Sequence, residues 1–326
     1  MRIKAILTII IIGFILYPVA LPPKFQDAII KIDEGDNLNI ISRKLKEARI
    51  IQDRPGFKLM VVIFEKSTSL SYGWYKFKIY EEPREILKSL IKGRRLTVKV
   101  FIPEGLKLNE TIYAFRRHTD AGINISELKN LIKDTTFIRK LGIDQPDLEG
   151  YLFPDTYIFY KGEKAEDVLK KMTSKLFSII KPSQKFKIKS REFSTHEILT
   201  IASMIEREAM VDREKPIIAS VIYNRLEKNM RLQIDATVLY ALGKHKTRVM
   251  YKDLRIKSPY NTYRNRGLPP GPIASPGFQS IMAALHPAKT DYLYYVATGK
   301  GDHIFSKTYK EHVKAKKKMN ERMLER

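Results

Sequence analysis

Glu206 is the main candidate for a catalytic residue in this 326-residue chain, because its carboxyl group falls in an apolar helical stripe. At about 100° per residue, Leu199 and Ser203 lie on the same helical face as Glu206. Glu208 falls on the opposite face, where we expect solvent. Burying a carboxylate without a partner is costly, so we expect Glu206 to stay protonated. A protonated carboxyl near neutral pH can act as a general acid.

The sequence also leaves a structural role for Glu206 open. A salt bridge to Arg225 or Arg231 would stabilise a buried carboxylate, and periodicity does not separate this interpretation from a catalytic one. No second carboxylate stands at an obvious paired position, although Asp155 and Asp235 are candidates that could equally cap a helix or a turn. Most glycosidases use two carboxyl groups. One is enough where the sugar supplies its own nucleophile.

The sequence lacks the residues that several other classes of reaction require. The chain has no cysteine, which excludes disulfides and thiol nucleophiles. His196-Glu197 begins a His-Glu-x-x-His pattern, but Thr200 stands where the second imidazole is required, so we predict no metal site. Neither a Gly-x-Ser-x-Gly motif nor a phosphate-binding loop occurs in the sequence. We therefore predict no cofactor.

A well-marked helix must position Glu206. Ser194 and Glu197 form a capping box, and Phe193 with Ile198 forms a hydrophobic staple. These signals predict a helix over residues 194–209. The same reasoning predicts helices over about 213–227, 232–242, 276–285 and 310–326, and a strand over 292–297.

A strand–turn–helix pattern occurs twice in the N-terminal third. In residues 29–51, alternating isoleucines precede a Glu34-Gly35 turn and a helical apolar pattern. In residues 98–115, alternating apolar residues precede the turn Pro103-Glu104-Gly105 and a second helical pattern. This is a weak internal repeat, although Glu-Gly turns before helices are common. We place a module boundary at residues 93–95.

The N-terminus predicts a membrane anchor. Arg2 and Lys4 precede residues 5–21, which carry no charge and have the minimum length of roughly 17 residues for a spanning helix. No Ala-x-Ala site precedes Pro22, so we favour an uncleaved single-pass anchor in the cytoplasmic membrane over a signal peptide. The positive-inside rule then places the rest of the chain on the extracytoplasmic side.

The chain is strongly basic, with 60 Lys and Arg residues against 36 Asp and Glu residues and a net charge of +24. Such a charge favours a polyanionic partner, which could be nucleic acid, anionic lipid or an acidic wall polymer. Because the predicted anchor places the basic region outside the cytoplasm, we predict no nucleic-acid partner.

Distinctive motifs follow one another along most of the chain. They are Glu149–Tyr157, Ile201–Glu206, Ser220–Leu226, Leu232–Asp235, Ser258–Tyr263, Gly267–Pro272 and His303–Ser306. Together they closely resemble the YceG-like family, the MltG endolytic murein transglycosylases. Ala236 and Ser275 depart from that resemblance, since we expect Pro and Asn there, and this difference concerns local loop geometry.

The resemblance implies an α+β fold in three parts. Residues 1–21 would be the transmembrane anchor, residues 22–95 a small LysM-like α/β module that binds peptidoglycan, and residues 96–326 a larger mixed α+β catalytic domain. The implied activity is non-hydrolytic cleavage of the MurNAc–GlcNAc β-1,4 bond in nascent glycan strands. The product would carry a 1,6-anhydro-MurNAc end, and cleavage near the peptidoglycan synthases would terminate strand elongation.

By motif position, Glu206 matches the family's catalytic glutamate. The resemblance implies that it protonates the leaving oxygen and then, as a carboxylate, accepts the proton of the attacking C6 hydroxyl. The candidate substrate-binding residues are Glu149, Tyr157, Asn224, Gln233, Asp235, Asn261 and Tyr263.

Two other functions remain open from the sequence. The first is a non-catalytic scaffold that binds peptidoglycan only through the LysM-like module. The second is a hydrolytic muramidase in which Asp155 or Asp235 supplies the second carboxylate. A hydrolase product would contain one added water molecule, so product mass separates it from a transglycosylase product.

Overall fold

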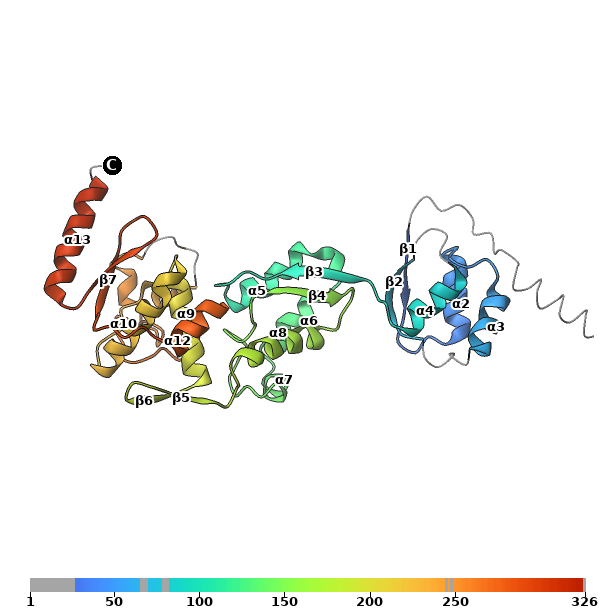
Figure 1. Cartoon of the computed structure of the whole chain (residues 1–326), viewed down its shortest axis with the longest axis horizontal. Coiled ribbons are helices and arrows are strands. Elements are labelled where there is room, and N and C mark those ends of the chain that lie inside the picture. Colours follow the sequence, from blue (N-terminus) through green and yellow to red (C-terminus); the bar gives the residue numbers. More distant parts are fainter. Residues whose placement is uncertain (1–26, 65–69, 78–81, 244–245, 247–248, 325–326) are drawn as a thin grey trace, which may run out of the picture. The chain divides into compact units, whose positions relative to one another are not determined.

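The computed structural model describes residues 27–64, 70–77, 82–243, 246 and 249–324. The fold is mixed α+β, as predicted, and its strands pair two by two as β1–β2, β3–β4, β5–β6 and β7–β8 (Figure 1). The predicted anchor over residues 1–21 lies outside the described residues. Within the described ranges, no helix combines the length and the apolar character needed to cross a membrane.

The chain divides into two compact units. Among the described residues, unit 1 comprises those from 27 to 98, 120–122 and 158–163, and unit 2 comprises the other described residues. The first segment of unit 1 ends at Val98, and unit 2 begins at Lys99. Two short segments from later in the chain, residues 120–122 and 158–163, belong to unit 1, which no local sequence pattern indicates.

Unit 1 consists of a small antiparallel sheet and three described helices. Its elements are β1 (Ala28–Ile32), α2 (Leu38–Glu47), α3 (Arg54–Ile63), β2 (Gly73–Phe77) and α4 (Pro83–Ile91). Ile30 pairs with Tyr75 across the sheet, and both side chains are buried. Asn37 caps α2 by accepting a 3.1 Å hydrogen bond from the Ile40 amide, so α2 begins where the predicted turn ends.

Unit 2 holds most of the helices. Strand β3 (Thr97–Phe101) begins in unit 1 and continues into unit 2, and strand β4 (Thr156–Tyr160) begins in unit 2 and continues into unit 1. The first half of unit 2 also contains α5 (Leu108–Ala114), α6 (Ile125–Leu131), α7 (Thr135–Lys140), α8 (Ala165–Ile179), β5 (Lys185–Ile188) and β6 (Arg191–Ser194). Its second half contains α9 (Thr195–Glu208), α10 (Lys215–Glu227), α11 (Asp235–Leu242), α12 (Phe278–Leu285), β7 (Tyr294–Ala297), β8 (His303–Ser306) and α13 (Tyr309–Leu324). Short 3₁₀ turns occur at Phe115–Arg117, Thr119–Ala121, Asp212–Glu214 and Asp253–Arg255.

The helix that carries Glu206 is the centre of unit 2. The predicted capping box is confirmed: Ser194 Oγ accepts from the Glu197 amide, and Glu197 Oε2 accepts from the Ser194 amide at 2.9 Å. Helix α9 packs against α10, α11, α12 and β6 (Figure 1). Its residues are therefore buried on several faces, including Thr200 and Met204 as well as the predicted apolar stripe.

The other helices predicted in this half are also confirmed. Helix α11 ends at Gly243, which adopts a left-handed conformation with φ 61°. Helices α10, α12 and α13 and strand β7 also form. Each of their ends lies within two residues of the end expected from the sequence. Both copies of the strand–turn–helix pattern also form, with Gly35 and Gly105 at positive φ in the two turns.

Candidate active site

Glu206 lies in the last turn of α9 with its carboxyl group directed at the start of α12. Its Oε2 atom accepts hydrogen bonds from Ser280 Oγ at 2.6 Å and from the Gly277 amide at 3.0 Å. Lys215 Nζ lies 3.7 Å from the same oxygen. The side chains of Glu206 and Lys215 are only 10% and 6% exposed. All of the contacts that the described residues make with this carboxyl group therefore converge on one oxygen and leave Oε1 without a hydrogen bond.

These partners correct the first expectation about Glu206. We expected a buried carboxyl without a partner, whereas the structure provides two hydrogen-bond donors and an ammonium group. Gly277 is the N-cap of α12, so the carboxyl group also faces the positive end of that helix. Such donors compensate a negative charge on Glu206.

Arg225 and Arg231, the two arginines considered as salt-bridge partners of Glu206, do not contact it. Arg225 donates to the backbone carbonyls of Leu293 at 2.6 Å and Leu232 at 2.7 Å, and it does not pair with Glu206. Arg231 supplies its own carbonyl oxygen to Arg225. The cation beside Glu206 is Lys215, the first residue of α10, which also lies 2.9 Å from Asp212.

The loop before α12 is fixed to α9 and to the turn after β3. Ser203, one turn before Glu206, accepts a hydrogen bond from the Ile273 amide at 3.0 Å. Ser275 exchanges two backbone hydrogen bonds with the β3–α5 turn, one from the Gly105 amide to its carbonyl and one from its amide to Leu106. The start of α12 is thereby held against Glu206 from two sides.

The same turn brings a second carboxyl group, Glu104, to the site. A Cβ atom added at Gly277 would lie 2.0 Å from Glu104 Oε1, so the Glu104 carboxyl group lies directly against the Gly277 backbone. A Cβ atom added at Gly105 would lie 3.7 Å from Glu206 Cγ. Partial burial and the negative charge of Glu206 raise the pKa of Glu104, while Lys215 opposes the shift.

Sequence reasoning missed Glu104, Lys215 and Ser280. The Pro103-Glu104-Gly105 turn was recognised as a turn, but its pairing with Ser275 joins segments about 170 residues apart. No local periodicity reports such a contact. Glu104 therefore lies near Glu206 in the folded chain, although it stands at no obvious paired position in the sequence.

An open groove of about 500 Å³ begins at Glu104. It is lined by residues 101–104 at the end of β3 and by residues 154–156 at the start of β4. Asp155, one of the two aspartates considered as a second carboxylate, lies in this groove and forms a salt bridge with Lys175 at 3.3 Å. Glu104 therefore connects the groove with the surroundings of Glu206.

The sequence placed Glu208 in solvent, and the structure contradicts this. Glu208 is partly buried, accepts a 3.0 Å hydrogen bond from Tyr295 Oη, and lies 3.4 Å from the Ala236 amide at the start of α11. Burial raises the pKa of its carboxyl group. The physical reason is that α11 and β7 cover the face of α9 that an isolated amphipathic helix would expose.

Three of the predicted substrate-binding residues are buried and hydrogen-bonded within the protein. Glu149 accepts from the Leu108 amide at 2.9 Å, Tyr157 donates to the Phe153 carbonyl at 2.7 Å, and Asn261 donates to two carbonyl groups of the 254–256 segment. These contacts hold together neighbouring segments of unit 2. Their roles as substrate contacts stay predictions.

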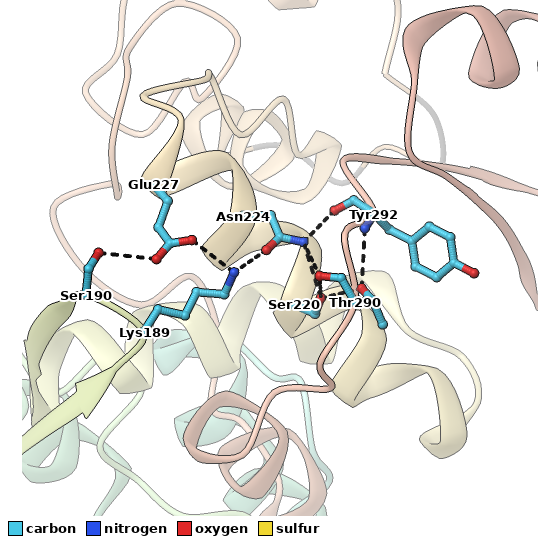
Figure 2. Close-up of polar contacts among 7 residues, drawn as sticks. All are labelled: Lys189, Ser190, Ser220, Asn224, Glu227, Thr290 and Tyr292. Carbon is cyan, nitrogen blue, oxygen red and sulfur yellow. Dashed lines mark hydrogen bonds and ion pairs between the residues drawn. The ribbon is translucent and has the colours of Figure 1, made fainter.

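Asn224 lies in a polar network that joins three segments of unit 2 (Figure 2). Its side-chain nitrogen donates to the carbonyls of Thr290 at 2.9 Å and Tyr292 at 2.8 Å, and its side-chain oxygen accepts from Lys189. Lys189 also contacts Glu227 at 3.0 Å. The side-chain amide of Asn224 thus connects α10 to residues 290–292, which precede β7, and to the β5–β6 turn.

The remaining three candidates lie together at the surface. Tyr263 donates a 2.5 Å hydrogen bond to Asp235, and Gln233, at a left-handed φ of 51°, precedes Asp235 by two residues. Gln233 and Asp235 are exposed, so both can meet a ligand. Asp235 is the first residue of α11, but the N-cap is Ile234 and no side chain caps this helix, so the structure does not bear out the cap role considered for Asp235.

The motif segments 149–157 and 267–272 contact each other. Gly150 has φ 78°, and a Cβ atom there would lie 2.4 Å from Pro272, so only glycine fits between the two loops. His196 accepts from or donates to Tyr151 Oη at 2.9 Å and lies 2.8 Å from the Pro270 carbonyl, which requires a proton on Nε2. His196 is thus a loop support rather than part of a metal motif.

The two departures from the family pattern have local consequences. The Ala236 amide points to Glu208 Oε1, a contact that a proline could not make. The Ser275 hydroxyl is buried without a hydrogen-bond partner among the described residues. In the same described part of the chain, no group of three or more acidic or histidine side chains could hold a metal ion.

This chain belongs to the YceG-like family, whose profile matches residues 30–318. The match covers both units and includes Glu104, Glu206, Lys215 and Ser280. The resemblance seen in the sequence motifs is thereby confirmed.

Similar proteins have related names. An endolytic murein transglycosylase of Bacillus subtilis is 40% identical over 305 residues, which is 89% of this chain and 84% of that protein. An endolytic murein transglycosylase of Streptococcus pneumoniae serotype 2 is 30% identical over 82% of this chain, but the aligned region is only 53% of that longer protein. A crystal structure of a YceG-like protein from Listeria monocytogenes has a TM-score of 0.55 and 35% identity, covering 89% of this chain and 99% of that one.

Proposed function

We propose that this protein cleaves the glycan strands of peptidoglycan as an endolytic lytic transglycosylase. Its enzyme class is that of a carbon–oxygen lyase acting on a polysaccharide. The observation that carries the proposal is the family match combined with one deeply placed carboxyl group, Glu206, close to Glu104 at the end of a groove. The relatives named endolytic murein transglycosylases support the same reaction.

The proposed reaction breaks the MurNAc–GlcNAc β-1,4 bond without water. The C6 hydroxyl of MurNAc attacks C1, the C1–O4 bond breaks, and the product carries a 1,6-anhydro-MurNAc end. One proton must leave the C6 hydroxyl and one must reach O4. Glu206 is the proposed catalytic carboxyl, and its Oε1 atom is the oxygen left available for proton transfer because the protein contacts fall on Oε2.

The finer parts of the proposal concern location and partners. Unit 1 would act as a LysM-like peptidoglycan-binding module, and residues 1–21 as a single-pass anchor in the cytoplasmic membrane with both units on the outside. Cleavage would then act on nascent strands near the peptidoglycan synthases and terminate elongation. The basic charge of the chain suits an anionic membrane surface and an acidic wall polymer.

Glu206→Gln is the test of the activity. The amide keeps the size of the side chain but cannot exchange a proton, so cleavage of uncrosslinked glycan strands should fall by on the order of 10²-fold or more. Glu192→Gln, an exposed glutamate of β6, is the matched control and should cleave normally. Retained formation of anhydro-ended products by purified Glu206→Gln would overturn the assignment.

Product mass separates the other two functions. A scaffold would bind the strands and release nothing, whereas a muramidase would release products heavier by one water and with a reducing end. The transglycosylase proposal requires anhydro-ended products from the native protein.

A further inference from the structure

We propose that Glu104 is a second catalytic carboxyl group and that it donates the proton to the leaving oxygen while Glu206 accepts the proton of the C6 hydroxyl. This inference rests on the proposed transglycosylase function. It divides between two side chains the two proton transfers that a one-carboxyl mechanism assigns to Glu206.

The first argument is position. Glu104 Oε1 would lie 2.0 Å from a Cβ atom at Gly277, and the amide of the same glycine donates to Glu206 Oε2. The two carboxyl groups therefore flank a single residue at the start of α12. A Cβ atom at this position would occupy the place of the Glu104 carboxyl group, so Glu104 can lie there because residue 277 is glycine.

The second argument is the difference between their surroundings. Glu206 has two hydrogen-bond donors and the Lys215 ammonium on one oxygen, which suits a carboxylate that accepts a proton. Glu104 forms no hydrogen bond or ion pair with the described residues. The described part of the protein therefore gives a negative charge on Glu104 no direct partner, and Lys215 is the cation that favours its ionised form.

The charges around Glu104 act in the same direction. Partial burial, Glu206 and Asp212 all raise the pKa of Glu104, and only Lys215 lowers it. Arg207, which could have neutralised this turn, instead donates to the Gly105 carbonyl at 3.1 Å. Two nearby carboxyl groups with different surroundings are the arrangement expected of an acid and a base that act together.

The third argument is access. Glu104 is exposed and lines the groove together with residues 101–103 and 154–156, whereas Glu206 is only 10% exposed. A sugar in the groove can therefore reach Glu104 directly. The strand turn that carries it is fixed by the two backbone hydrogen bonds between residues 105–106 and Ser275, so its position does not depend on a mobile side chain alone.

The proton balance closes without water. The proton of Glu104 moves to O4 as the C1–O4 bond breaks, and Glu206 takes the proton of the C6 hydroxyl as the O6–C1 bond forms. The products leave Glu104 ionised and Glu206 protonated. Transfer of one proton from Glu206 to Glu104 then restores the starting state, with no net gain or loss.

The experiment compares two substrates in the full-length protein. On uncrosslinked glycan strands, Glu104→Gln should lower kcat by on the order of 10²-fold or more, with KM within about threefold of the native value. The second substrate is GlcNAc-MurNAc with a β-linked 4-nitrophenyl group, which leaves as a phenolate without needing a proton. Here Glu104→Gln should cleave within about tenfold of the native rate, while Glu206→Gln should stay inactive because the C6 hydroxyl still needs a base.

The outcomes separate this inference from the proposed function. If Glu104→Gln loses the same factor on both substrates, Glu104 holds the site in shape and is not the acid. If the Glu104→Gln variant keeps the native kcat on glycan strands, Glu104 has no catalytic role. Either of these two results overturns the inference. The transglycosylase function still stands in both cases if the native protein forms anhydro-ended products. Glu192→Gln is the control for removing one acidic group from unit 2 and should match the native protein on both substrates.

Discussion

Ser280 Oγ donates a 2.6 Å hydrogen bond to Glu206 Oε2 from the first turn of α12. Ser280 is fully buried and lies 74 residues after Glu206 in the chain. The bond fixes the rotation of the Glu206 carboxyl group, because Gly277 donates to the same oxygen. The other oxygen, Oε1, receives no hydrogen bond from the described residues.

Ser280→Ala should therefore weaken catalysis without unfolding the protein. A hydrogen bond to a charged group is worth about 1.5–3 kcal/mol, which corresponds to roughly a 10- to 100-fold fall in kcat/KM. Steady-state cleavage of glycan strands measures the effect. Gln279→Ala, the exposed neighbour on α12, is the matched control, and equal activity of the two variants would show that Ser280 does not orient Glu206.

Gly277→Ala tests the contact between Gly277 and Glu104. The φ of Gly277 is −78°, which alanine adopts without strain, so the only conflict is the 2.0 Å approach of the new Cβ to Glu104 Oε1. Displacement of Glu104 should lower kcat about as much as Glu104→Gln does. The thermal unfolding midpoint should change by no more than a few degrees.

A double-mutant comparison tests whether the effect of Gly277→Ala depends on Glu104. In a Glu104→Ala background the Cβ of Ala at position 277 has room, so Gly277→Ala should cause little further loss of kcat. Fully additive losses in the double variant would show that Gly277 acts independently of Glu104.

The sequence predicted the local elements of unit 2 well, because each depends on neighbours within a few turns. The capping box of Ser194 and Glu197 and the left-handed Gly243 are signals of this kind. Helical periodicity placed the carboxyl group of Glu206 in an apolar stripe, and the resemblance to the YceG-like family favoured a catalytic role over a salt bridge. Its partners were not, because Gly277 and Ser280 reach it only through the packing of α12 on α9.

Glu208 and Glu104 illustrate the limit of periodicity in opposite ways. Periodicity assigns one face of a helix to solvent, but other elements pack around α9, so Glu208 is partly buried and accepts a hydrogen bond from Tyr295. Glu104 lies in a turn, where no periodic signal exists, and its importance follows only from the backbone pairing of residues 105–106 with Ser275. Long-range pairings of this kind fix most of the candidate site.

Asn224→Ala separates a structural role from a substrate contact. Loss of the hydrogen bonds to the Thr290 and Tyr292 carbonyls leaves those groups without their donor, so the free energy of unfolding should fall by about 1–3 kcal/mol (Figure 2). KM for glycan strands should stay within about twofold of the native value.

Ser190→Ala removes an exposed member of the same network and is the control, with an expected change within about 0.5 kcal/mol (Figure 2). Urea unfolding and glycan cleavage give the two readouts. A raised KM with unchanged stability would instead make Asn224 a substrate contact, as the sequence motif suggested.

Glu149→Gln should stabilise the protein increasingly as the pH rises. Burial raises the pKa of Glu149 from 4.5 to about 8, although the Leu108 amide and Tyr240 Oη both donate to its carboxyl group. Below 4.5 both the folded and the unfolded forms hold the proton, so the pKa shift does not affect stability there. Between 4.5 and about 8 the unfolded form ionises while the folded form keeps its proton, which destabilises the fold progressively.

Glutamine does not titrate, so the stability of Glu149→Gln relative to the native protein should rise across this window, by at most about 1.4 kcal/mol per pH unit. Urea unfolding followed by circular dichroism, at several pH values on either side of the window, measures the difference. Glu192→Gln removes an exposed carboxyl group of the same unit and controls for the loss of charge alone. A difference between Glu149→Gln and the native protein that stays flat from 4.5 to 8 would show that Glu149 is ionised in the folded protein. The carboxyl group would then hold α5 and α11 together as a charged acceptor for Leu108 and Tyr240.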